Sequence, residues 1–240
     1  MSLPEGLPAT AALWLEDTYR LEATATVLAA AQLDDDGDGR WAVVLDASPF
    51  HPQGGGQASD VGRVAAERST LAVRAVRMDR GSGIVVHEGA FEGEPFRPGD
   101  SVSCAVHEPT RLTSARVHSA GHLIDTAMER CGVTSDVLAP TKGYHFESGA
   151  YVEYAGKLSV EEREALLPRL QEALDGLIAE GLPVEVETKD GSRHVTIGGV
   201  GCGCGGTHVR RVDQIGRVEL KGIKKKGKAM RVSYAVVDAA

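Results

Sequence analysis

The sequence predicts an α+β protein, in which a small β-barrel is followed by helices on one face of an antiparallel sheet. Two observations lead to this prediction. Residues 14–106 hold short runs rich in valine, isoleucine and threonine, with turn clusters between them and no helical period. From Pro109 onward, apolar residues recur at helical spacing between further strand-like runs. We therefore expect two domains, residues 1–106 and residues 107–240.

The first half contains five strand-like runs. Turn clusters at Asp34–Gly39 and Glu92–Gly99 separate some of them. Several short strands at this spacing are typical of a small barrel. The expected strands are Leu21–Val27, Trp41–Leu45, Leu71–Val76, Gly83–His87 and Val102–Val106.

The second half alternates between helices and strands. We expect one helix from its cap at Thr110 to about Cys131, ended by Gly132. A second helix is expected from a capping box at Ser159–Glu162 to Glu180-Gly181, kinked or divided by Pro168. Strands that complete one α+β layer are expected at Ala150–Tyr154, Val184–Thr188, Arg217–Ile223 and Arg231–Val237.

Composition indicates a soluble globular protein. The 240 residues are 42% hydrophobic and 25% charged, and no stretch approaches the roughly 20 apolar residues of a membrane span. The N-terminal residues lack a basic region and carry Glu5, Glu16 and Asp17, which is unlike a secretory signal. Four cysteines are too few for a disulfide scaffold in a chain of this size. We expect a cytoplasmic protein whose thiols are reduced.

Positive charge is concentrated near the C-terminus. Residues 209–231 contain nine basic and two acidic residues, a net +7, so the rest of a chain of net −8 carries −15. A basic strip on an acidic body is typical of a protein that binds phosphates at one place. A solvated lysine hairpin is the alternative interpretation. The lysines that we predict to bind the phosphates of a nucleic-acid backbone are Lys224, Lys225, Lys226 and Lys228.

Two residue pairs have the spacing of metal ligands. His118 and His122 are four apart on a predicted helix, so both imidazoles share one face. Cys204 and His208 are also four apart, in a glycine-rich loop that allows a tight approach. Together they form a His₃Cys set that suits the tetrahedral shell of zinc. Cys202 could compete with Cys204, but it lies six residues from His208.

The ligand set alone leaves the role of the metal open. A catalytic zinc usually keeps one position for water, so four ligands would close the site unless one leaves or the zinc becomes five-coordinate. The motif His118-Ser-Ala-Gly-His122 lacks the glutamate of metalloproteases, which weakens a peptidase or amidase interpretation. A structural zinc remains an alternative. Four histidines have no partner at ligand spacing and are interpreted as surface or strand residues: His51, His87, His107 and His194.

Several motifs resemble those of the AlaX family and of the related editing domain of alanyl-tRNA synthetase. The ligand motif is His118-x-x-x-His122 with Cys204-Gly-Gly-Thr-His208. The first half adds a glycine-rich motif, Ser48-Pro-Phe-His-Pro-Gln-Gly-Gly-Gly-Gln57. The resemblance covers roughly residues 14–237 and also includes Trp14–Tyr19, Arg116–Ile124 and Asp213–Arg217.

The resemblance implies a hydrolase that deacylates tRNA(Ala) mischarged with serine or glycine. It also implies that His118, His122, Cys204 and His208 hold a Zn²⁺ that activates a water molecule. A non-catalytic, zinc-containing RNA-binding module is the alternative. The glycine-rich residues expected near the substrate, a barrel turn being the alternative, are Gly54, Gly55, Gly56 and Gln57.

One departure concerns the amino-acid pocket. In relatives that edit serine, a threonine after the first helix senses the seryl hydroxyl. A gap-free count puts Leu138 at that position, and the nearest threonine is Thr141. We take Leu138, Thr141 and Lys142 as candidate substrate-binding residues, with the preference between serine and glycine open.

Overall fold

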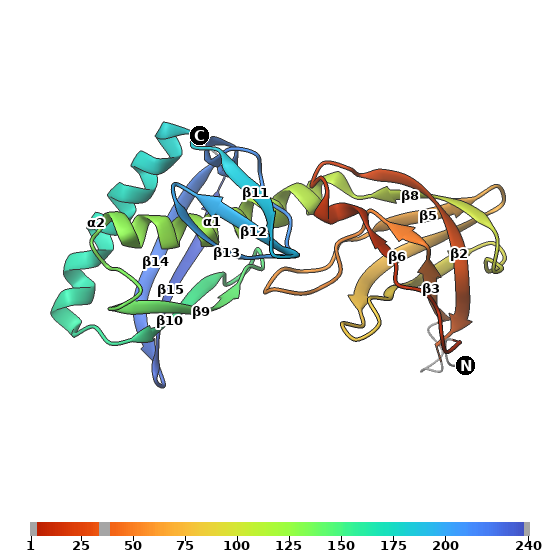
Figure 1. Ribbon diagram of the computed structural model, residues 1–240, viewed down its shortest axis with the longest axis horizontal. Coiled ribbons are helices and arrows are strands. Elements are labelled where there is room, and N and C mark those ends of the chain that lie inside the picture. Colours follow the sequence, from red (N-terminus) through yellow and green to blue (C-terminus); the bar gives the residue numbers. More distant parts are fainter. Residues whose placement is uncertain (1–3, 34–38, 238–240) are drawn as a thin grey trace. The chain divides into compact units, whose positions relative to one another are not determined.

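The protein divides into two compact units. A computed structural model describes residues 4–33 and 39–237 (Figure 1). The first unit comprises Met1–Gly54 and Ala58–Arg111, and the second comprises Gly55–Gln57 and Leu112–Ala240. Three residues of the glycine-rich motif thus group with the second unit. Of the turn predicted at Asp34–Gly39, only Gly39 lies within the described residues.

The first unit is a closed six-stranded barrel, which confirms the predicted barrel. Strand β5 was missing from the predicted runs, because its five residues include glycine and arginine and form no apolar run. A two-residue parallel pair, β1 (Ala11–Ala12) with β4 (Ala47–Ser48), lies outside the barrel order. The barrel order is β2 (Glu22–Gln32), β3 (Arg40–Leu45), β7 (Val85–Glu92), β6 (Ser69–Met78), β5 (Gly62–Ala66) and β8 (Ser101–Val106).

Apolar side chains fill the barrel, and one charged pair is buried in the same unit. Val43, Leu45 and Leu71 are fully buried in its core. Arg111 is also fully buried, and its Nε donates to both carboxylate oxygens of Asp60 at 3.1 and 3.0 Å. A buried charge needs such pairing, because desolvation of an unpaired ion is costly.

The second unit contains two antiparallel sheets. The larger sheet has the order β14 (Arg217–Lys226), β15 (Ala229–Val237), β10 (Tyr151–Gly156) and β9 (Leu138–Tyr144). The smaller sheet has the order β11 (Val184–Lys189), β12 (Ser192–Ile197) and β13 (Val200–Gly203) (Figure 1).

The prediction that Val184–Thr188 joins a single layer was wrong. This segment lies in β11, which pairs with β12 over six residues and belongs to the smaller sheet. Asp190 and Gly191 connect these two strands, both with positive φ (50° and 75°). An Asp-Gly pair is a strong hairpin signal, so β11 pairs with its neighbour in sequence and stays apart from the larger sheet.

Two long helices complete this half, and both differ in detail from the prediction. Helix α1 (Glu108–Arg130) begins before Thr110, whose hydroxyl lies 2.8 Å from Nδ1 of His107 within the first turn. Thr110 is therefore not the cap. Helix α2 (Val160–Glu180) has the predicted capping box and remains one helix through Pro168. The hydrogen bond that proline cannot make is offset by burial of the side chains Leu166, Leu170, Leu174 and Leu177.

Helix α1 contacts both sheets of the second unit and thereby places its histidines in the shared core. Thr126 donates to the carbonyl of Ile197 on β12 at 2.9 Å, and Tyr234 on β15 donates to the carbonyl of Val117 at 2.9 Å. His118 is 1% exposed. No helix within residues 4–33 and 39–237 is long and apolar enough to cross a membrane.

Candidate metal centre and its pocket

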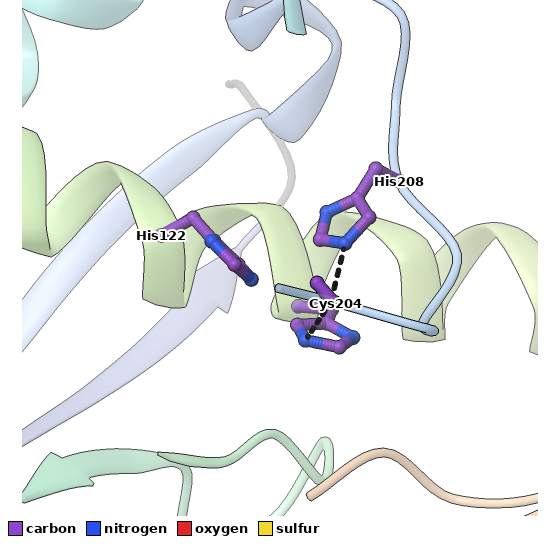
Figure 2. Close-up of side chains that lie close together, drawn as sticks. His122, Cys204 and His208 are labelled. Atoms are coloured by element: carbon purple, nitrogen blue, oxygen red, sulfur yellow. Dashed lines mark hydrogen bonds between the residues drawn. The ribbon is translucent and has the colours of Figure 1, made fainter. Parts of the chain in front are cut away.

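The four predicted ligands come together in the second unit. The ligand atoms of His118, His122, Cys204 and His208 all lie within 4.8 Å of one another. Figure 2 shows His122 projecting from helix α1 toward Cys204 and His208, which lie on the segment after β13. Residues about eighty positions apart in the sequence thus form one cluster.

The distances around the Cys204 sulfur are close to those of a tetrahedral zinc site. The Cys204 sulfur lies 3.2 Å from Nε2 of His208 and 3.5 Å from Nε2 of His118. At bond lengths of about 2.0–2.3 Å, corners of a zinc tetrahedron are roughly 3.3–3.8 Å apart. Imidazole nitrogen and thiolate sulfur are also the donor atoms that zinc prefers.

Each imidazole is oriented through its second nitrogen. Nδ1 of His118 lies 2.7 Å from Oε1 of Gln57, and Nδ1 of His208 lies 3.1 Å from Oγ of Ser119. Nδ1 of His122 lies 3.8 Å from the sulfur of Cys202. These contacts leave Nε2 of each ring for the ion, in the outer-shell arrangement usual for metal-binding histidines. The structure thus places Cys202 behind the candidate ligand His122 and Cys204 among the candidate ligands.

Gln57 supports His118 from the glycine-rich motif. Its amide is fully buried, donates to Oγ1 of Thr207 at 2.9 Å and accepts from the backbone of Thr207 at 3.0 Å. A side chain on Gly206 would put its Cβ 2.2 Å from the His118 ring, so glycine is required beside it. Gln57, predicted to face the substrate, therefore holds a candidate ligand in position.

Burial favours the metal-binding form of His122 and disfavours the metal-binding form of Cys204. Burial, assisted by Arg193, lowers the pKa of His122 from 6.5 to about 4, so its imidazole is neutral at pH 7. Burial raises the pKa of Cys204, against the opposing effects of the Gly206 amide and Arg193. Metal binding must then displace the thiol proton, which makes metal affinity dependent on pH.

A cavity of about 310 Å³ adjoins the cluster. His118, His122 and Cys204 line it, so the candidate metal centre is accessible from the cavity. Its other lining residues include Gly55, Gly121, Asp125, Thr141, Lys142, Gly143, His145 and Cys202.

The predicted substrate residues are distributed unevenly around this cavity. Thr141 and Lys142 line it, and the Thr141 hydroxyl donates to the carbonyl of Glu153 at 3.1 Å. Leu138 is 2% exposed and packs in the hydrophobic core of the second unit. Gly56 has a φ of 79°, and a Cβ there would lie 2.3 Å from the carbonyl oxygen of Gly143. Gly54 belongs to the first unit.

His145 lies near the candidate substrate segment in the sequence, which left its role open, and the structure places it in the cavity lining. Its ring stacks on His118 with centroids 4.4 Å apart, and its Nδ1 lies 2.7 Å from the hydroxyl of Tyr234. Burial, assisted by His122, lowers its pKa to about 3. A Cβ on Gly121 would lie 2.3 Å from this ring, which explains the glycine in the His118–His122 motif.

Asp125 also lines the cavity, and the sequence analysis gave it no role. It follows His122 by three positions and His118 by seven, so helical periodicity puts all three on one face. That spacing was a usable signal. Its carboxylate accepts a hydrogen bond from the hydroxyl of Tyr154 at 2.6 Å.

The basic strip lies on the hairpin of β14 and β15. Lys224, Lys225 and Lys226 end β14, Lys228 follows Gly227 in the turn, and all four lysines are exposed. Arginines of the same strip are paired instead, Arg217 with Glu219 and Arg231 with Glu153. Within the described residues the four lysines form no ion pair, so their charges are available to a ligand.

Comparison with known proteins gives a consistent set of relatives. Residues 17–110 match the family of class II (A) tRNA synthetases. The chain is 28% identical to alanyl-tRNA editing protein AlaX-M of Methanosarcina mazei, over 94% of this chain and 95% of the relative. The protein of the same name from Methanosarcina barkeri is also 28% identical, over 94% and 98%. Alanine–tRNA ligase of Streptomyces avermitilis is 28% identical over 81% of this chain, which spans 24% of that longer protein.

Proposed function

We propose that this chain, which belongs to the AlaX family of alanyl-tRNA editing proteins, hydrolyses the ester between a wrong amino acid and tRNA(Ala). Serine and glycine are the proposed amino acids, and zinc is the proposed metal. One observation carries the proposal: three of the four candidate ligands line a cavity of about 310 Å³. A purely structural zinc has no need of such access.

Different residues of the chain would bind the metal, orient its ligands and bind the tRNA. His118, His122, Cys204 and His208 would hold a zinc ion, which would supply Lewis-acid activation of water and of the ester carbonyl at neutral pH. Gln57 and Ser119 orient two of the ligands through Nδ1 of their rings. Lys142 at the cavity wall and the four exposed lysines of the hairpin bind phosphates of the tRNA. The ester is activated already, so no covalent nucleophile is required.

Deacylation by the purified protein tests this proposal. Ser-, Gly- and Ala-tRNA(Ala) are incubated with the protein, with and without a chelator, and free amino acid is measured. We expect release of serine or glycine, little release of alanine, and loss of activity with the chelator that added zinc restores. Zinc and tRNA binding without amino-acid release would identify a non-catalytic RNA-binding module instead.

A further inference from the structure

The cavity beside the metal centre has one acidic residue in its lining. Asp125 is the single carboxylate among the described residues that line it. One of its oxygens, Oδ1, accepts from the hydroxyl of Tyr154 at 2.6 Å. Within the described residues no hydrogen bond reaches the other oxygen, Oδ2. A partly buried carboxylate thus has one oxygen committed to the protein and one available to a ligand.

The proposed substrate carries a group of matching charge. An amino acid esterified to tRNA keeps a free α-ammonium group on the carbon next to the reacting carbonyl. When that ammonium leaves water for the cavity, desolvation is costly unless an anion accepts its hydrogen bonds. Among the other lining residues Lys142 would repel an ammonium, and none of the rest carries a carboxylate. Asp125 alone among the lining residues meets the requirement.

We propose that Asp125 binds the α-ammonium group of the aminoacyl ester and thereby confines the enzyme to esters with a free α-amino group. The inference rests on the proposed deacylase function and adds a subsite to it. Asp125 contacts the substrate without touching the bond that is broken.

Tyr154 is the positioning residue for this subsite. Its ring is 1% exposed, its backbone is fixed by strand β10, and its hydroxyl holds Oδ1. Burial raises the pKa of the Asp125 carboxyl to about 6, while the Tyr154 hydrogen bond opposes the rise. The group is therefore an anion at pH 7.5, with a desolvation cost that a bound ammonium relieves.

The test compares two esters that differ only at the α position. One is seryl-tRNA, and the other is its α-hydroxy analogue, in which a hydroxyl replaces the ammonium. Hydrogen bonds to charged groups are worth roughly tenfold to hundredfold in a rate constant or affinity. We expect wild type to prefer the amino ester by at least about tenfold in kcat/KM. Asp125→Asn should reduce this ratio to near one, and Tyr154→Phe should reduce it in part.

The control is Glu129→Gln, a charge-neutral change at an exposed position of the same helix. This variant should keep the wild-type ratio. Equal rates of wild type on the two esters would overturn the inference while leaving the deacylase proposal intact. The same ratio in wild type and Asp125→Asn would also overturn it.

Binding separates a failure of the inference from a failure of the proposed function. The probe is serine joined by an amide bond to 3′-aminoadenosine, compared with its α-hydroxy analogue, and binding is measured by calorimetry. If no ester is hydrolysed, the deacylase proposal fails, yet a tenfold preference for the ammonium probe that Asp125→Asn removes would still support the subsite. Equal affinity of wild type for both probes would overturn it. Circular dichroism confirms that each variant is folded.

Discussion

His87 in the barrel and His145 beside the metal centre are both buried, neutral histidines, and they differ in what their second nitrogen meets. Nδ1 of His87 donates to the carbonyl of Val43 at 3.1 Å, and its Nε2 lies 2.7 Å from the hydroxyl of Ser48. Nδ1 of His145 is hydrogen-bonded to the hydroxyl of Tyr234, and within the described residues no hydrogen bond reaches its Nε2. Burial lowers the pKa of both, to about 4 and about 3.

A lowered pKa is common to both histidines, whereas an incomplete set of hydrogen-bond partners beside the cavity is found only for His145 and makes it the candidate for a functional role. The buried Arg111–Asp60 pair belongs with His87, because its groups are satisfied by one another and by backbone carbonyls. Asp125 belongs with His145, because it lines the cavity with one oxygen uncommitted. Replacing a side chain whose polar atoms are all paired should therefore affect stability. Replacing one that has an unpaired polar atom at the cavity should affect activity.

The largest expected effect is at the metal centre. We predict about one zinc per chain, and we expect Cys204→Ala and His118→Ala each to abolish editing, because each removes a donor atom of the ligand set. Metal analysis of the purified variants and deacylation assays check this.

Cys202→Ala is the matched control for the thiol at position 204. The Cys202 sulfur lies 3.8 Å from Nδ1 of His122, so the metal content of Cys202→Ala should stay near wild type. A full complement of zinc in both Cys204→Ala and His118→Ala would contradict the ligand set.

The second prediction concerns His87, whose two ring nitrogens both have hydrogen-bond partners. Its pKa is about 4 in the folded chain and 6.5 when unfolded, so the unfolded state binds the proton first as pH falls. The stability it contributes is complete above pH 6.5 and is lost as the pH falls through 4, an effect on the order of 3 kcal/mol. Urea unfolding of His87→Asn should show a shallower loss over this range than wild type. Identical pH dependence would contradict the assignment.

The third prediction compares paired and unpaired cations of the basic strip. Replacing Lys224, Lys225, Lys226 and Lys228 by glutamine should lower the salt slope of tRNA binding by about 0.9 for each phosphate that a lysine no longer neutralises. The paired cations Arg217 and Lys221, replaced in the same way, are the control and should change the slope less. Every tRNA should be affected similarly. Weakening confined to tRNA(Ala) would show that the strip reads tRNA identity.

The smallest expected effect is at Thr141. Its hydroxyl proton is committed to the carbonyl of Glu153, so its oxygen is left to accept a hydrogen bond from a seryl hydroxyl at the cavity. Thr141→Val should cost about 1–1.5 kcal/mol, roughly tenfold in rate, on seryl-tRNA. Glycyl-tRNA has no hydroxyl and should be little affected. Equal rates on both substrates, before and after the substitution, would exclude the sensing role.

Sequence periodicity predicted the elements whose signals are local. Short runs rich in valine, isoleucine and threonine indicated the barrel strands, and the Ser159–Glu162 capping box predicted the start of helix α2. Strand β9 (Leu138–Tyr144) was missed, because its Pro140 and Gly143 weaken any strand signal. Its pairing with β10 over non-local contacts outweighs that local preference.

The pairs His118–His122 and Cys204–His208 were predictable because each pair is close in sequence. The support of His118 by Gln57 was not, since 61 residues separate them and no period connects them. The role of His145 stayed open for the same reason, because Tyr234, 89 residues away, is what orients its ring. Asp125 was missed although its helical spacing from His122 was visible.

The hydrogen bonds of Gln57 have a consequence for how the protein is made. They join position 57 to Thr207 across 150 residues, and His145 depends on Tyr234, close to the end of the described chain. Contacts this distant in sequence form late and slowly. During synthesis on the ribosome, the barrel strands emerge well before the residues that complete the metal centre. A growing chain therefore cannot form these contacts until the segment that contains Thr207 and Tyr234 has left the ribosome.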